Sequence, residues 1–303
     1  SLDIWRKAGD RFPQGWEDRF VFELYAEQVR AAVSGLLDRL KLAPGDFART
    51  AWYGHDRRGQ GTAARALGFD PSAQINGSLF DTAGNTGAAL APMMLVEALE
   101  ETKAGDRLLM VSYGDGCDTL ALRVGAEKQG GWHSRGIKGH LGSKLSLGSY
   151  GKYLRFRDLC EWAPERRPPD RSAPTALHRD RSQIYPLKGQ RCRRCGGIQY
   201  AIISRGRVCT WCQARDDFEE IRLSDKRGTL FTFSMDQRAM EVELPNVLCV
   251  VDLEGGGRFY GQMTDREPEK LEVGMPVELT FRRIHGGSGL HNYFWKVRPI
   301  RVP

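Results

Sequence analysis

Four cysteines in two Cys-x-x-Cys pairs constrain this chain more than any other feature of its sequence. Cys192 and Cys195 form the first pair, and Cys209 and Cys212 form the second. Each pair can place two thiolates on one side of a tight turn, and two such turns supply the tetrahedral set of sulfur ligands that Zn²⁺ favours. All four positions of the ion are then filled, so we expect a structural zinc in a zinc ribbon over residues 181–217. The alternative is two redox-active or unpaired pairs of thiols.

A β-rich segment follows the cysteines. Five short runs rich in β-branched and aromatic residues are separated by Gly and Pro turns, at 229–233, 247–253, 258–263, 277–281 and 293–297. This pattern predicts a small closed barrel, such as an OB-fold, over residues 218–303. Such barrels can bind nucleic acid through aromatic side chains in a basic groove. Residues 192–303 hold 17 Lys/Arg against 15 Asp/Glu, however, which argues against a nucleic-acid partner.

The first 124 residues have the pattern of an α/β unit. Apolar residues recur at helical spacing over 20–42 and stop at Pro44-Gly45. Short apolar runs predict buried strands that deliver polar or Gly-rich loops at their ends. The expected strands are 50–53, 108–111 and 119–124, the expected helices are 62–67 and a segment from Asn85 or Thr86 to Thr102, and 112–116 is expected to be a flexible loop. Helices packed on a mixed sheet are the expected fold.

The excess positive charge lies between these two parts. Residues 125–191 hold 14 Lys/Arg and 6 Asp/Glu, whereas residues 1–124 hold 14 and 17. We therefore predict a basic linker over 125–180, with a short helix near Tyr150–Trp162. The linker is either simply solvated or a loop that meets an anionic ligand or partner.

Bulk properties exclude several classes of protein. The chain has 303 residues, of which 41% are hydrophobic and 10% aromatic, so it is long enough for about two domains. No run approaches the roughly 18 apolar residues of a membrane helix, and the N-terminus is not a secretory signal. The seven cysteines fit a reducing compartment, so we expect a cytoplasmic protein without membrane contact. Because the chain begins with Ser1 rather than Met, we also expect a processed or truncated product.

Short motifs in a constant order carry a resemblance to known enzymes. They are Asp3-Ile-Trp-Arg6, Asp18-Arg-Phe20, Trp52-Tyr-Gly-His55, Gly84-Asn-Thr-Gly-Ala-Ala89 and Gly105-Asp-Arg107 leading to Ser112-Tyr-Gly114. On these motifs residues 3–124 resemble the C-terminal half of hydroxymethylglutaryl-CoA synthases and, more broadly, the ketoacyl synthases of the thiolase superfamily. Three further runs, Cys192–Cys212, Val250-Val-Asp-Leu-Glu254 and Val273-Gly-Met-Pro-Val277, carry a second resemblance. On them residues 150–303 resemble the rubredoxin-type zinc ribbon and OB-fold that are fused to, or partnered with, such thiolase-like proteins.

This resemblance implies a Cys-His-Asn chemistry on CoA thioesters. A Cys thiolate accepts the acyl group, while His and Asn activate the second substrate and stabilise negative charge on the thioester oxygen. The matching positions are His55 and Asn85 for catalysis, with Gly84, Tyr113 and Gly114 at the substrate. Asp56-Arg57-Arg58 follows the His where the family has Gln-Pro-Asn or Gln-Ala-Asn. The non-catalytic alternatives are a structural or surface His at position 55 and a simple helix N-cap at Asn85.

The nucleophilic Cys belongs to the half of the fold that these residues lack, and Cys117 lies where the family has no nucleophile. We therefore expect an acyl-CoA carbon–carbon bond enzyme, an acyltransferase, whose Cys is supplied by another chain or by a missing upstream half. The helix over 86–99 would otherwise leave an apolar face exposed, which predicts a tight complex. Three alternatives stay open: a non-catalytic scaffold subunit of a thiolase-like complex, a retro-aldol lyase acting on CoA thioesters, and a nucleic-acid binder.

Overall fold

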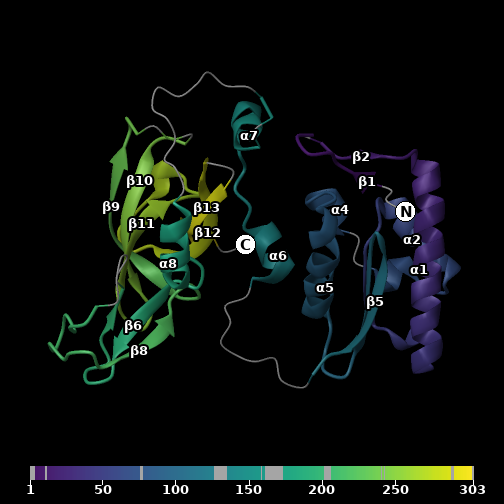
Figure 1. The fold of residues 1–303 in the computed structure, drawn as a ribbon, viewed down its shortest axis with the longest axis horizontal. Coiled ribbons are helices and arrows are strands. Elements are labelled where there is room, and N and C mark those ends of the chain that lie inside the picture. Colours follow the sequence, from purple (N-terminus) through teal and green to yellow (C-terminus); the bar gives the residue numbers. More distant parts are fainter. Residues whose placement is uncertain are drawn as a thin grey trace. The chain divides into compact units, whose positions relative to one another are not determined.

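The computed structural model describes residues 4–10, 12–75, 78–125, 135–157, 159–160, 173–200, 206–239, 241, 243–287 and 290–301. The chain divides into two compact units, residues 1–142 and 143–303 (Figure 1). The predicted boundaries at 124, 180 and 217 are finer than this division, and residues 126–134 and 161–172 of the predicted linker lie outside the described residues. No helix in the described ranges is long and apolar enough to cross a membrane.

The first unit is built on a three-stranded mixed sheet. Strand β4 (Arg107–Gly114) lies at its centre, parallel to β3 (Arg49–Trp52) and antiparallel to β5 (Gly116–Arg123). Consecutive residues Leu108 and Leu109 are both fully buried, so both faces of this strand are covered. The continuous apolar run that predicted a buried strand therefore has the expected burial.

Two long helices cover the two faces of this sheet. Helix α1 (Asp18–Leu40) packs on β4 and β5, and α5 (Leu90–Glu101) packs on β3 and β4. Figure 1 shows β5 between them. Residues four apart along α1, Tyr25, Val29 and Val33, form its buried stripe. The helix ends at Lys41, which takes a left-handed conformation with φ 53°.

Short elements connect these helices and strands. They are β1 (Ile4–Trp5), β2 (Gln14–Gly15), η1 (Pro44–Asp46), α2 (Arg57–Ala66), α3 (Pro71–Gln74), α4 (Ser78–Thr82), η2 (Gly87–Ala89) and α6 (Gly136–Gly142). Helix α2 begins five residues before the predicted 62–67 because the Asp56 side chain accepts the Gly59 N–H at 2.7 Å and caps it. Two glycines in its first turns weaken the helical pattern and hide this start.

Two further expectations for the first unit were wrong. Residues 112–116 do not form a flexible loop, because Ser112, Tyr113 and Gly114 continue β4 and pair with Asp118, Cys117 and Gly116 in a tight hairpin. The Ala-rich helix does not begin at Asn85 or Thr86 either. A 3₁₀ turn, η2, precedes it, and Gly84 and Gly87 take positive φ values of 75° and 63° that break regular helix before Leu90.

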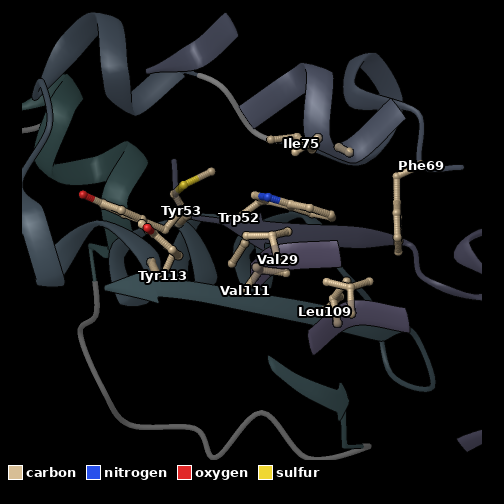
Figure 2. Packing of buried hydrophobic residues seen from close by; sticks show 14 of the residues in the cluster. Val29, Trp52, Tyr53, Phe69, Ile75, Leu109, Val111 and Tyr113 are labelled. Carbon is tan, nitrogen blue, oxygen red and sulfur yellow. The ribbon is translucent and has the colours of Figure 1, made fainter. Parts of the chain in front are cut away.

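The core of the first unit centres on Trp52. Its side chain is fully buried and meets Phe69 edge-on, with ring centroids 5.4 Å apart (Figure 2). The Trp52 Nε1–H donates to the Tyr25 hydroxyl at 2.8 Å, and this hydroxyl donates to the Tyr53 carbonyl at 2.9 Å. Helix α1 is thereby tied to the end of β3 by two buried hydrogen bonds.

The second unit contains the predicted OB-fold barrel, which is confirmed. Its strands are β9 (Arg227–Asp236), β10 (Asn246–Leu253), β11 (Arg258–Met263), β12 (Pro276–Gly287) and β13 (Leu290–Pro299). They close in the order β10-β11-β13-β12-β9, and β11 and β13 are the parallel pair. Alternate residues of β10, Val247, Cys249 and Val251, point into the core.

A second, three-stranded sheet carries the cysteines. Its order is β7-β6-β8, with β6 (Lys188–Cys192) between β7 (Ile198–Gln199) and β8 (Phe218–Arg222). Strand β8 lies in sequence within the predicted barrel segment, yet it pairs with β6. Two helices precede this sheet. Helix α7 (Tyr150–Phe156) is shorter than the predicted 150–162, and α8 (Pro174–Ile184), which crosses the predicted boundary between linker and zinc ribbon at 180, was not predicted.

Adding a methyl group to one glycine in each unit should change stability in opposite directions. An added Cβ at exposed Gly35 in α1 meets nothing within 4 Å, so Gly35→Ala should stabilise the first unit by ~1 kcal/mol. At Gly228 it would press on Val251 and lie 2.6 Å from the Asp252 carbonyl oxygen, so Gly228→Ala should destabilise the second unit by about 1–3 kcal/mol. Native-state hydrogen exchange measures each unit separately, and effects of the same sign would contradict this packing.

Candidate active site and cysteine cluster

His55 lies just beyond the carboxyl end of β3. Pairing with β4 continues through Tyr53, whose N–H donates to the Val111 carbonyl at 2.9 Å. Gly54 follows, and a Cβ there would come 3.0 Å from the Gln60 side chain, so the chain turns tightly against α2. His55 is half-buried at this turn. The carboxyl end of parallel strands is the usual place for a site in an α/β fold.

Three tyrosines surround the His55 ring. Its centroid lies 6.1, 5.9 and 5.5 Å from those of Tyr25, Tyr53 and Tyr113, each in an edge-to-face arrangement. Figure 2 shows Tyr53 and Tyr113 lying together beside Trp52. Burial raises the pKa of Tyr25 well above its ordinary value, so its hydroxyl stays neutral. These contacts restrict how the imidazole can turn.

A small pocket opens beside His55. It has a volume of about 30 Å³ and is lined by His55 together with Val21, Phe22, Tyr25, Asp56 and Gly59. This is room for roughly one or two water molecules. Helix α1, helix α2 and the N-cap residue of α2, Asp56, supply the rest of the lining, and Asn85 is not among these residues.

Asn85 comes to the main chain of His55 from thirty positions away in the sequence. Its Nδ2 donates to the His55 carbonyl at 3.3 Å, and its Oδ1 accepts the Gly87 N–H at 2.8 Å. The hydrogen bond from the Gly87 N–H is a local side-chain-to-backbone contact, similar to the helix N-cap that was the non-catalytic alternative for Asn85. The side chain is otherwise exposed, in the loop between α4 and η2. The structure thus brings Asn85 to His55 without placing both in the described pocket.

The other candidate residues lie at different depths. Tyr113 is buried against His55 and Tyr25, whereas Gly114 lies at the exposed end of the β4–β5 hairpin. Gly84 is half-buried next to Asn85. Sequence reasoning missed Tyr25 and Tyr53, because their spacing in an apolar helix and strand is that of ordinary core residues.

Cys117 has the properties of a structural thiol. It lies opposite Tyr113 in the hairpin, and burial, together with the charge of Asp118, raises its pKa to about 11. A thiol with this pKa is almost wholly protonated near neutral pH, and the thiolate is the nucleophilic form.

The apolar side chains on the outward side of α5 are only partly covered by the described residues. Val96 and Leu99 are each 41% exposed, and Pro92 is also exposed. They follow one another at helical spacing and lie on the side away from the buried Leu90, Met94 and Ala98. The predicted apolar helix therefore has one buried and one open face.

The four cysteines of the Cys-x-x-Cys pairs gather at one point of the second unit. Their Sγ atoms all lie within 4.8 Å of one another, with Cys192 and Cys212 3.7 Å apart and Cys195 and Cys209 3.6 Å apart. Backbone N–H groups of Cys212 and Trp211 point at the Cys209 sulfur and lower its pKa. Such an arrangement of four thiols could hold one metal ion.

The two turns that carry these cysteines repeat the same backbone pattern. The Gly196 N–H donates to the Cys192 carbonyl at 2.8 Å, and the Gln213 N–H donates to the Cys209 carbonyl at 3.0 Å. Both donors take left-handed conformations, with φ 73° and 60°. In each turn the first cysteine N–H then donates at 2.9 Å to a carbonyl five residues later. The site is therefore two copies of one knuckle that face each other.

Comparisons with known proteins relate the chain to two kinds of relative. Residues 220–282 match the model of the ChsH2 C-terminal OB-fold domain. A DUF35 domain-containing scaffold protein of Methanocaldococcus jannaschii is 40% identical over 121 residues, which are 38% of this chain and 83% of that protein. The hydroxymethylglutaryl-CoA synthase of Methanopyrus kandleri is 31% identical over 120 residues, 40% of this chain but only 34% of that enzyme.

One solved structure covers a similar share. A chain of the Ltp2-ChsH2(DUF35) aldolase aligns with 44% of this chain and 98% of its own, at 23% identity and a TM-score of 0.32, too low for a functional inference. The sequence matches are stronger. On them, the chain belongs to the family of DUF35 domain-containing scaffold proteins and is in addition similar to about a third of the length of hydroxymethylglutaryl-CoA synthases.

Proposed function

We propose that the first unit is the His- and Asn-bearing half of a thiolase-type enzyme that forms or cleaves a carbon–carbon bond in acyl-CoA thioesters. One observation carries this proposal: the Asn85 amide donates to the His55 carbonyl at 3.3 Å, so two residues implicated by one motif pattern meet at the end of β3. The similarity to hydroxymethylglutaryl-CoA synthases supports the same chemistry.

The two side chains have distinct roles in this proposal. His55, held among three tyrosines, moves a proton to or from the second substrate. Asn85 has two Nδ2–H donors, of which one is used by the His55 carbonyl, so the other can donate to the thioester oxygen as negative charge develops. Tyr113 positions His55. Gly84 and Gly114 have no side chains, so the ligand can approach the protein backbone there.

The proposal requires a Cys from outside the described residues. Cys117 is a protonated thiol, and the remaining cysteines outside the cluster are Cys160 and the buried Cys249. The open apolar side of α5, with Pro92, Val96 and Leu99, is the surface on which a Cys-bearing chain or upstream half would pack. Such a partner would also cover exposed Asn85 and exclude water from the site.

A second candidate function is that of a scaffold subunit without catalysis. The membership in a family of scaffold proteins favours it, as does the absence of an activated Cys beside His55 in the described chain. A third candidate function is that of a retro-aldol lyase acting on CoA thioesters, which needs no acyl-Cys intermediate. The three differ in whether an acyl group becomes covalently attached and in whether His55 affects turnover.

In each case we propose that the cysteine cluster holds a structural Zn²⁺. Tetrahedral zinc with Zn–S bonds of about 2.3 Å separates its sulfurs by about 3.8 Å, and two of the pairs here are 3.6 and 3.7 Å apart. The paired knuckles supply four protein ligands, which leaves no position for a reacting water. The ion would hold the β7-β6-β8 sheet together and take no part in the reaction.

Removing one ligand should release the metal. We expect about one zinc per chain in the wild type and a large loss of zinc in Cys192→Ser, because three sulfurs cannot complete the S₄ set. Cys160→Ser, at an exposed cysteine outside the cluster, is the control and should keep the metal. Metal analysis of the full chain by mass spectrometry measures both. Equal zinc contents in the two variants would contradict the site.

His55 and Asn85 should matter for turnover and not for assembly. In the complex isolated through the tagged chain from its own organism, we expect His55→Ala to lower kcat/KM for an acyl-CoA panel by about 10²–10⁴-fold. For Asn85→Ala we expect about 10²–10³-fold. Thr86→Ala, at the adjacent exposed residue, should retain activity. Native mass spectrometry checks that each variant keeps its partner. A wild-type complex without activity, or one that His55→Ala leaves unaffected, would favour the scaffold function.

Cys117 should be dispensable for the reaction. Because burial raises its pKa to about 11, its alkylation by iodoacetamide should accelerate roughly tenfold per pH unit between about pH 7 and 10, as the thiolate fraction rises. Cys117→Ser should leave turnover unchanged. Acid quenching of the complex with a labelled acyl-CoA, followed by peptide mass spectrometry, locates the acyl group. Label on Cys117 would overturn the requirement for an external Cys.

A further inference from the structure

A tryptophan projects into solvent from the cysteine cluster. Trp211 lies between the two ligands of the second knuckle, and it is 69% exposed. Most side chains of this size are largely buried, since burying an aromatic ring is strongly favourable. An exposed Trp at a fixed turn therefore indicates a binding surface more strongly than an exposed Leu on a helix does.

The position of this ring is fixed by both knuckles. The Trp211 N–H donates to the Cys209 sulfur at 3.4 Å, which locks its backbone. The ring lies on Gly197 of the first knuckle, where an added Cβ would collide with it and come 3.0 Å from its Cγ. Gly197 therefore leaves the space that the ring occupies. Because the ring is already ordered, little conformational entropy is lost when something binds to it.

Two arginines of the first knuckle form no ion pair with a carboxylate in the part of the chain that the structure describes. Arg193 and Arg194 lie between the ligands of the first knuckle and are exposed, and neither forms an ion pair with any described carboxylate. Other basic residues of this sheet differ, because they are paired. These pairs are Lys188 with Glu220, Arg191 with Glu219 and Arg207 with Asp216.

We propose that Arg193, Arg194 and Trp211, here called the knuckle tip, bind an acidic patch on a partner protein. Trp and Arg are among the residues that most often dominate protein–protein binding energy. The charges of the tip require a negatively charged surface opposite. This inference rests on the proposed scaffold role, for which it names a contact surface.

The neighbouring carboxylates favour a protein over a nucleic acid as this partner. The Arg193 N–H donates to the Asp217 carbonyl at 3.1 Å, so an exposed acidic residue adjoins the tip, and Asp216 is next to it in sequence. A phosphate backbone presents negative charge along its whole length and would be repelled there. A folded protein can place its carboxylates opposite the arginines alone. Nucleic-acid sites also commonly stack several bases on several aromatic rings, and the tip has one.

The direct test measures binding of an acidic polypeptide to the full zinc-loaded chain. Immobilised wild-type chain should bind tetra-L-glutamate, a peptide short enough to place its carboxylates opposite the arginines alone. Trp211→Ser and the double variant Arg193→Ser/Arg194→Ser should each bind it at least about tenfold more weakly. The control is Tyr260→Ser/Arg238→Ser, which removes an exposed aromatic and an exposed Arg on the barrel. Zinc content must be equal in all four proteins. Equal contents exclude the alternative that the two arginines only balance the negative charge of the zinc-binding thiolates.

A second measurement uses the natural complex. The tagged chain is purified from its own organism, and the partner recovered with the wild type is quantified for each variant. We expect the tip variants to lose this partner while His55→Ala keeps it, so failure of the tip and failure of the catalytic proposal give different results. Tip variants that keep both the partner and tetra-L-glutamate would overturn the inference. Tighter, tip-dependent binding of a single-stranded oligonucleotide would also overturn it, in favour of nucleic acid.

Discussion

The geometry of the candidate active site depends on a short chain of buried hydrogen bonds. The Trp52 indole donates to the Tyr25 hydroxyl, which donates to the Tyr53 carbonyl, so α1 is fixed to the end of β3 two residues before His55. Each bond contributes only about 1 kcal/mol net, but a buried partner left without its bond costs about 1–3 kcal/mol. The loss of one partner therefore destabilises the fold by more than the bond itself stabilises it. Trp52 and Tyr25, which are part of the core, thereby also position the backbone that leads to His55.

In the second unit the cysteine sheet and the barrel share one core. Leu187, Ile198 and Leu223, from the sheet and its flanks, pack in the same cluster as the barrel residues Val251 and Phe259. Gly257, in the β10–β11 turn, lies so close to Ile198 that an added Cβ would be 2.9 Å from its side chain. A metal held by the two knuckles would therefore stabilise more than the knuckles themselves, since β6 carries Cys192 at one end and meets this core at the other. A scaffold function benefits from this coupling because it presents the knuckle tip on a rigid base.

Sequence patterns predicted the parts of this chain in which one local rule decides the structure. Cysteine spacing predicted the cluster, and alternation with Gly and Pro turns predicted the five barrel strands. The approach of Asn85 to His55 was expected from the resemblance alone, since no local rule joins residues thirty positions apart. Helix α8 was missed because its arginines and His178 resemble a solvated linker, although Pro174 at its first turn is a usual start signal. The hairpin at Gly114–Gly116 was mistaken for a loop because glycines there signal flexibility, while its pairing comes from the cross-strand partners. The tyrosines around His55 could not be distinguished from core residues, since their function depends on tertiary contacts.

The exposure of Asn85 links the catalytic and the scaffold interpretations. An amide hydrogen bond to a developing oxyanion contributes much less in water than in a site from which water is excluded, because the effective dielectric constant is several times higher. Asn85 is exposed in this chain, and the neighbouring apolar side of α5 is exposed too. In the proposed catalysis by His55 and Asn85, a second polypeptide would have to cover this surface. Recruitment of that polypeptide is itself a scaffold function, and the second unit belongs to a family of scaffold proteins. Both interpretations therefore include a recruited chain. They differ in whether that chain brings a cysteine to a thioester held at His55 and Asn85 or the assembly serves a reaction carried out entirely elsewhere.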